Sequence, residues 1–160
     1  MPTFDISSEF NKQEVSNAVD QCHREISNRY DFRDTKTSIS LMDNSILLKS
    51  STLDRMLAAE QVLKEKFVKR SVSIKFLGDV KDETLPSEVK RIYNLKSGID
   101  QSTSKEIITL LKKSNKKIQC SYQNETIRVT SKKRDDLQEA ITLIKESDIE
   151  TPLNFGNFRD

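Results

Sequence analysis

Basic and aromatic side chains gather in two parts of this sequence, and together they suit recognition of a phosphate and a base. Residues 112–134 hold eight basic residues and a single acidic one, Glu125. The stretch YDFRD, residues 30–34, joins two aromatic rings to an arginine, and Phe158 with Arg159 repeats that pairing. An arginine fork grips phosphate and can stack on a base, and an aromatic ring offers a second stacking face. These residue types predict nucleotide recognition.

Other chemistries are poorly supported by the composition. The chain has one histidine, His23, and two cysteines, Cys22 and Cys120, which lie far apart and are expected to be reduced core thiols. No metal site is predicted from this set. Three glycines provide no phosphate-binding glycine loop, and no triad is evident. We therefore expect a non-enzymatic protein without a cofactor.

An internal repeat indicates the fold that must position these residues. Residues 40–65 align without a gap on residues 121–146, so that Ile46 meets Ile127 and Ala59 meets Ala140. Each copy reads as two short strands, a two-residue turn and an amphipathic helix. We predict an α+β fold with two ferredoxin-like β-α-β-β-α-β copies and antiparallel sheets, residues 1–80 and 88–160.

The remaining segments complete each copy. Asn11 and Thr52 are the expected N-caps of the two helices in the first copy, and a strand near residues 73–77 is expected to close its sheet. Residues 78–88 contain Gly, Pro and acidic residues without apolar periodicity, and so predict a linker. In the second copy, Tyr93 and Leu95 are aligned with Phe4 and Ile6.

The topology predicts where the candidate site residues lie. In such a fold the first helix ends, the second strand starts and the second helix starts at one end of the sheet. Hairpin geometry then places Lys117 opposite Lys132, beside a helix N-terminus that favours anions. Tyr30 continues an apolar helical stripe and is expected in the core, whereas the orientations of Phe32 and Phe158 stay open. The candidate nucleotide-binding residues are Arg29, Phe32, Arg33, Lys117, Lys132, Arg134, Phe158 and Arg159.

Four motifs give the sequence a family resemblance. MPTFDISSE at the start, RYDFRD at residues 29–34, SKKRDDLQ at 131–138 and the terminal NFGNFRD resemble the YajQ-like family of nucleotide-binding proteins. The resemblance covers the whole chain. It implies that residues 1–8 and 89–97 exchange places between the two sheets. It also implies a nucleotide ligand, with cyclic di-GMP and roles in signalling or transcriptional control described for members. The family usually has a small N-cap residue where this chain has Lys133.

Two other functions remain open at this stage. An RNA-binding module would use the sheet faces, where Lys49, Arg128 and Thr130 could meet phosphates, although the third strands lack stacking aromatics. A protein–protein adaptor, for example for a transcription regulator, would need no ligand. No apolar run is long enough to span a membrane, and the N-terminus lacks the features of a signal peptide. We expect a cytoplasmic protein with no membrane partner.

Overall fold

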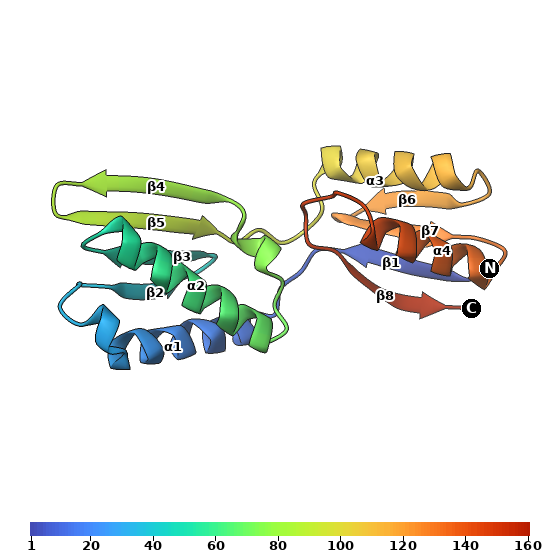
Figure 1. Ribbon diagram of the computed structural model, residues 1–160. Helices are drawn as coiled ribbons and strands as arrows, with labels where there is room; N and C mark the ends of the chain where they lie inside the picture. The colour runs from blue at the N-terminus through green and yellow to red at the C-terminus, as the bar shows by residue number, and fades with distance from the viewer. The chain divides into compact units, whose positions relative to one another are not determined.

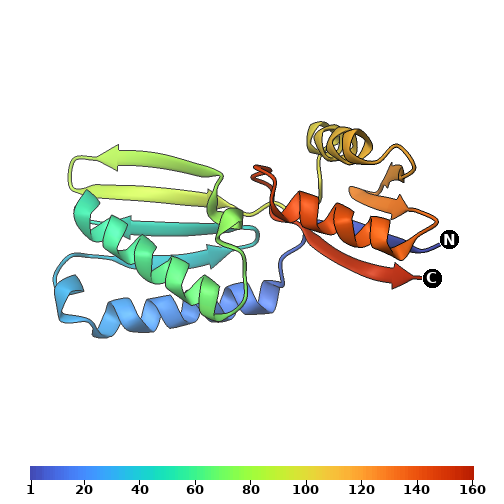
Figure 2. The ribbon, with the colours of Figure 1, turned by 45° about the vertical axis from the view of Figure 1, so that its right-hand side comes forward.

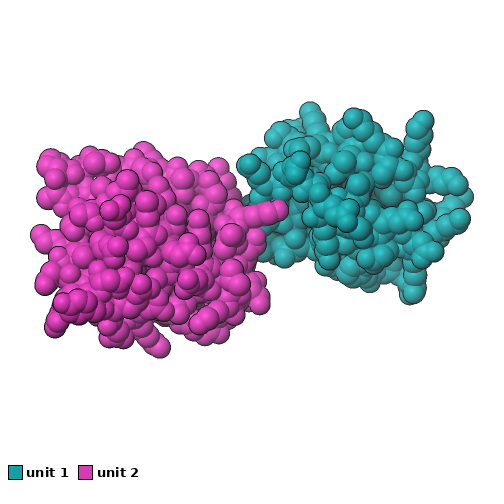
Figure 3. All heavy atoms as spheres, viewed as in Figure 1, with its two compact units in different colours: residues 1–9, 97–160 teal, residues 10–96 magenta.

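The chain forms two compact units, each built from one four-stranded antiparallel sheet and two long helices. The structure, a computed structural model, describes residues 1–160. Unit 1 comprises residues 1–9 and 97–160, and unit 2 comprises residues 10–96 (Figure 3). Each unit has its own apolar core, and no buried residue of one core cluster belongs to the other.

Unit 2 has the strand order β2-β3-β5-β4, with two helices packed on one face (Figures 1 and 2). Its strands are β2 (Ser38–Met42), β3 (Ser45–Ser50), β4 (Val80–Leu85) and β5 (Glu88–Asn94). The helices are α1 (Lys12–Asn28) and α2 (Leu53–Lys69), with short 3-10 helices η1 (Tyr30–Phe32) and η2 (Ile74–Leu77). The buried face of β3, Ile46 and Leu48, packs under both helices.

Unit 1 repeats this arrangement with the strand order β6-β7-β1-β8. The strands are β1 (Thr3–Ser7), β6 (Gln119–Gln123), β7 (Thr126–Thr130) and β8 (Asn154–Arg159). The helices α3 (Gln101–Ser114) and α4 (Arg134–Lys145) bury Ile107, Leu111, Leu137 and Ile141 against Phe4 and Ile6. Both chain ends lie in this unit (Figure 1).

The two helices of unit 2 have side-chain N-caps at the residues that the sequence predicts. The Asn11 side chain accepts a hydrogen bond from the Glu14 amide at 3.1 Å, and Thr52 does the same for Arg55 at 3.3 Å. Each cap satisfies one of the amides that a helix start leaves free. Lys133 is the N-cap of α4 and makes no capping bond through its side chain. The first turn of α4 therefore keeps amides available to another acceptor.

The predicted α+β fold with antiparallel sheets is confirmed. Strand β1 pairs with β7 and β8, while β5 pairs with β3 and β4, which is the exchange that the family resemblance implies. The two turns also have the predicted length, because Met42 pairs with Ser45 and Gln123 with Thr126. The division of the sequence into two repeated copies, residues 1–80 and 88–160, stays a prediction.

Two predicted elements are wrong. Residues 74–77 form η2 instead of a strand, because the neighbours Phe76 and Leu77 are both buried and an extended chain would point one of them outward. The fourth strand is β4, inside the stretch that we predicted as a linker. Five of its six residues are exposed, so this edge strand has no apolar alternation to reveal it.

The predicted alignment of Tyr93 with Phe4 is also wrong, as the partners of β1 and the partners of β5 show. Ile127 pairs with Ile6 and Val129 with Phe4, whereas the repeat equivalents Ile46 and Leu48 pair with Tyr93 and Arg91. Arg91 in unit 2 therefore occupies the place of Phe4 in unit 1. Glu60, on α2, likewise occupies the place of Ile141 on α4 in the repeat alignment.

An ionic network consequently replaces an apolar contact in unit 2. Arg91 Nη1 lies 2.7 Å from Glu60 Oε2, and its other nitrogens contact both oxygens of Asp82 at 2.7 and 2.9 Å. The Tyr93 hydroxyl donates to the same Glu60 oxygen. Burial raises the pKa of the Glu60 carboxyl, yet the hydrogen bonds from Tyr93 and Arg91 outweigh burial and hold that pKa below its usual value.

None of the helices is both long and apolar enough to cross a membrane. No group of three or more His, Cys, Asp or Glu side chains is arranged as a metal site.

Candidate nucleotide-binding site

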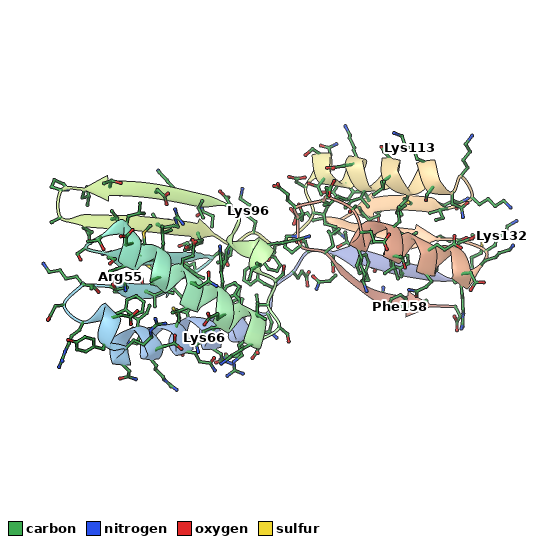
Figure 4. The ribbon with its side chains drawn as sticks, viewed as in Figure 1. Arg55, Lys66, Lys96, Lys113, Lys132 and Phe158 are labelled. Carbon is green, nitrogen blue, oxygen red and sulfur yellow. The ribbon has the colours of Figure 1, made fainter.

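Four lysines surround a hollow of about 540 Å³ at one end of unit 1. We call it the lysine hollow. It lies where α3 ends, β6 begins and β7 runs into α4, and Lys132 projects from this end in Figure 4. Its walls are Met1, Asn115, Lys116, Lys117, Gln119, Ser131, Lys132, Lys133 and Asp136.

Local geometry brings the lysines together. The Asn115 side chain accepts from the Lys117 amide at 3.0 Å and so shapes the turn that leads from α3 into β6. Gln119 pairs with Thr130, so the residues just before β6 and just after β7 meet at the same edge. The hairpin that sets this register turns at Asn124 and Glu125, both with positive φ, as a type I′ turn requires.

The charge of the lysine hollow is largely uncompensated. None of Lys116, Lys117, Lys132 and Lys133 makes an ion pair within 4.0 Å. The one acid in the wall, Asp136, accepts a 2.9 Å hydrogen bond from the Ser131 hydroxyl. Four ammonium groups beside the start of α4 form an environment that favours a phosphate group.

The candidate residues of unit 1 fall into different environments. Lys117 and Lys132 lie in the same hollow, as hairpin geometry predicts. Arg134 does not line it, because its guanidinium pairs with the Asp160 carboxylate. Phe158 is 62% exposed, and one face of its ring stacks on the buried Phe4 at 5.9 Å between centroids. Arg159 makes no ion pair within 4.0 Å and pairs through its backbone with Thr3 at this end of the sheet.

A second hollow, of about 630 Å³, lies at the corresponding end of unit 2. We call it the tyrosine hollow. It is formed by the end of α1, by η1 and by the loop before β2, and it is lined by Ile26, Ser27, Asn28, Arg29, Tyr30, Phe32, Arg33, Asp34, Lys36 and Thr37. It thus brings together Arg29, Phe32 and Arg33, which the sequence predicts as site residues.

The structure separates the roles of these residues, and two expectations change. Tyr30 is 83% exposed, so its predicted place in the core is wrong. α1 ends before it, and η1 turns Phe32 inward in its place, only 5% exposed. Phe32 is covered by the guanidinium groups of Arg29 and Arg55, at 5.1 and 6.0 Å from its ring centre. Its ring is therefore closed to a stacking ligand.

Arg29 is also engaged within the protein. It contacts both oxygens of Asp31, at 3.0 and 2.8 Å, and Glu25 at 3.1 Å. Arg55 approaches Asp31 as well, at 3.3 Å. Arg33, in contrast, makes no ion pair, and its guanidinium lies 6.0 Å from the ring centre of Tyr30. Among the predicted residues of unit 2, Arg33 is the one whose charge is free for a ligand.

The outer sheet faces lack the features of an RNA-recognition surface. The aromatic residues on strands, Phe4, Tyr93, Tyr122, Phe155 and Phe158, belong to the helix-covered side or pack on it. Arg128 is bound to Asp5 at 3.0 Å, and this hydrogen bond lowers the pKa of the Asp5 carboxyl. Lys49 lies opposite Lys90 without an aromatic partner. A base would find no stacking platform there.

Three basic residues outside the predicted set also line the two hollows. Lys116 and Lys133 are sequence neighbours of Lys117 and Lys132, and the same hairpin register would have included them. Lys36 follows YDFRD, and its φ of 53° places it in a left-handed turn before β2. A positive φ at a lysine has no signal in the sequence.

Comparison with known proteins identifies the family. The family model described as Nucleotide-binding protein YajQ-like matches residues 2–159. Curated relatives called "Nucleotide-binding protein" come from Hahella chejuensis, 42% identical over 164 residues, and from Legionella pneumophila, 43% identical over 164 residues. A further relative of that name, from Coxiella burnetii, is 43% identical over 161 residues. In each case the alignment covers 100% of both chains. The chain therefore belongs to the YajQ-like family of nucleotide-binding proteins.

Proposed function

We propose that this chain is a non-enzymatic, cytoplasmic nucleotide-binding protein and that it holds the ligand's phosphate groups in the lysine hollow. The observation that carries the proposal is the set of four lysines around one hollow, none of which makes an ion pair with an acidic side chain. Lysines fixed near one another repel, and a phosphate relieves that repulsion while accepting their N–H groups. The N-cap residue Lys133 makes no side-chain capping bond, so the start of α4 adds backbone N–H donors at the same place.

The family supplies the finer candidate for the ligand. Relatives are named nucleotide-binding proteins. The resemblance of the four sequence motifs implies cyclic di-GMP and a role in signalling or transcriptional control. A cyclic dinucleotide carries two phosphates and two bases. The lysine hollow suits the phosphates, because it contains no aromatic side chain that could receive a base. We therefore propose cyclic di-GMP as the first ligand to test.

RNA is the second candidate, and the same absence of an aromatic wall favours it. A row of lysines without a stacking face can follow a sugar–phosphate backbone regardless of base. The outer sheet faces do not add to this candidate, since they lack stacking aromatics. RNA binding would therefore run through the same lysines and would show little preference among sequences.

Calorimetry with a matched pair of variants tests the proposal. The first variant is Lys117→Ala/Lys132→Ala. The control is Lys112→Ala/Lys113→Ala, which removes the same charge from the same unit but outside the hollow; Lys113 projects from α3 in Figure 4. Cyclic di-GMP, GTP, ATP and a short RNA are titrated at 50 and 200 mM salt.

We expect the first variant to bind at least about 10-fold more weakly, with a flatter salt dependence, and the control to bind nearly as the wild type does. Preference for cyclic di-GMP over RNA would identify the ligand, and the reverse would establish the second candidate. Equal losses in both variants would mean that overall charge, and not the hollow, governs binding, and would overturn the proposal.

A further inference from the structure

Tyr30 presents an aromatic ring to solvent at the tyrosine hollow of unit 2. It is 83% exposed, and with Phe158 it is one of two aromatic residues that are largely exposed in the chain. Phe158 rests on Phe4, but no other aromatic ring packs on Tyr30. A ring exposed in this way offers a stacking face to a planar ligand.

The charges around Tyr30 favour an anionic or electron-rich partner. Asp31 is already held by Arg29 and Arg55. Arg33 and Lys36 both line the tyrosine hollow and make no ion pair, and Asp34 is the one acid left without a basic partner. Arg33 sits over the Tyr30 ring at 6.0 Å and has N–H donors to spare for a base edge or a phosphate.

The loop that carries these side chains is tightly held. The Thr35 hydroxyl lies 2.6 Å from the Phe32 carbonyl oxygen and 2.6 Å from the Thr37 hydroxyl, which in turn lies 3.0 Å from the hydroxyl of Ser50. The Ser51 amide donates to the Thr35 carbonyl oxygen at 2.8 Å. These bonds maintain left-handed conformations at Asp34 and Lys36, with φ of 60° and 53°. A loop fixed in this way loses little entropy when a ligand binds.

We propose that the tyrosine hollow is a base-binding subsite, in which a nucleobase stacks on Tyr30 and Arg33 flanks it. The proposal rests on the proposed function and names the part of the nucleotide that unit 2 recognises. The ligand class is a planar heteroaromatic ring attached to a sugar phosphate. Lys36 lies in the same wall and can meet the phosphate. Base binding in the tyrosine hollow does not require that the same ligand molecule occupy the lysine hollow.

The small number of tyrosines makes the stacking directly observable. The chain has three tyrosines and no tryptophan. The hydroxyls of Tyr93 and Tyr122 bond to Glu60 and to the Ile99 carbonyl, whereas Tyr30 has no such bond. With 13C-labelled tyrosine rings, Tyr30→Phe assigns its resonance by deletion. AMP and GMP are then compared with ribose 5-phosphate, which has the phosphate and sugar but no base.

Stacking predicts that AMP or GMP shifts the Tyr30 resonance through the ring current of the base, and that ribose 5-phosphate leaves it nearly unchanged. Tyr30→Ala should weaken mononucleotide binding by about 5- to 100-fold. Tyr30→Phe should retain the affinity, since it keeps the ring. Because Tyr30 is exposed, neither variant should change the melting temperature appreciably.

The Lys117→Ala/Lys132→Ala variant separates this inference from the proposed function. It should weaken ribose 5-phosphate binding while the Tyr30 shift with AMP or GMP persists. Equal shifts with ribose 5-phosphate and the mononucleotides, or an unchanged mononucleotide affinity in Tyr30→Ala, would overturn the base-binding subsite. Unchanged phosphate binding in the lysine variant would overturn the lysine hollow instead.

Discussion

The ionic network of unit 2 and the apolar contact of unit 1 offer a built-in comparison of two ways to fill one position. Glu60 and Arg91 stand where the repeat places Ile141 and Phe4. The side chains of Glu60 and Arg91 are only 15% and 17% exposed. Removing one partner of a buried pair costs about 3–5 kcal/mol, and residual exposure lowers that figure. We predict that Glu60→Ile destabilises the protein by about 2–4 kcal/mol.

Arg91 and Tyr93 both lose a contact with Glu60, but the effects differ. Arg91 keeps its two contacts with Asp82, so its charge is not stranded. The Tyr93 hydroxyl loses its acceptor in a residue that is 0% exposed, which contributes about 1–3 kcal/mol of the total. Restoring the pattern of unit 1 should therefore require three changes, Glu60→Ile, Arg91→Phe and Tyr93→Phe. We expect the triple variant to return to within about 1 kcal/mol of the wild type.

Urea unfolding of the full chain, followed by circular dichroism, measures these differences. The two units can unfold separately, so the transition of unit 2 must first be assigned with the single variant. A cost below about 1 kcal/mol for Glu60→Ile would show that the network is a solvent-screened surface pair. A triple variant as unstable as the single one would show that the ion pair has no apolar equivalent in this core.

Two further predictions concern a glycine and a thiol. Gly98 has a φ of +92°, and a Cβ there would meet the Glu125 carboxylate, so Gly98→Ala should cost about 1–2 kcal/mol by thermal unfolding. Because the Glu125 side chain can move, a Glu125→Ala background should leave most of that cost, and its disappearance there would place the strain in the contact instead. Burial is the main cause, and the charge of Glu25 a smaller one, that raises the pKa of the Cys22 thiol to about 12. Cys22 should hence stay unmodified by a thiol-specific disulfide reagent at pH 8 until the protein unfolds, whereas the half-buried Cys120 should react first; fast labelling of Cys22 in the native state would contradict this.

The sequence allowed much of the fold to be predicted, since strong periodicity survives in the elements that bury one face. The repeat predicted both hairpins and the helix after Thr52, and the cap residue Asn11 predicted the first helix, because caps and two-residue turns act locally. It failed at β4, whose polar residues lie exposed at a sheet edge. It also failed at Tyr93, because its correct alignment with Ile6 would have required knowing that Arg91 could take a core position. For the site, Lys117 and Lys132 followed from hairpin register. The outward turn of Tyr30 did not, because the end of α1 and the 3-10 turn after it depend on tertiary packing of Phe32.

The strand exchange has a consequence for how the chain can be assembled. Unit 2 is continuous, residues 10–96, so it is in effect an inserted domain that interrupts unit 1 after β1. The two ends of the interruption are adjacent within unit 1, because the Gly98 amide donates to the Ser8 carbonyl oxygen at 2.5 Å. During synthesis unit 2 can fold as soon as β5 has emerged, whereas β1 must wait for β7 and β8, the last strands made. Unit 2 expressed alone carries every strand of its own sheet, and a chain that joins residue 9 directly to residue 97 carries every strand of the other.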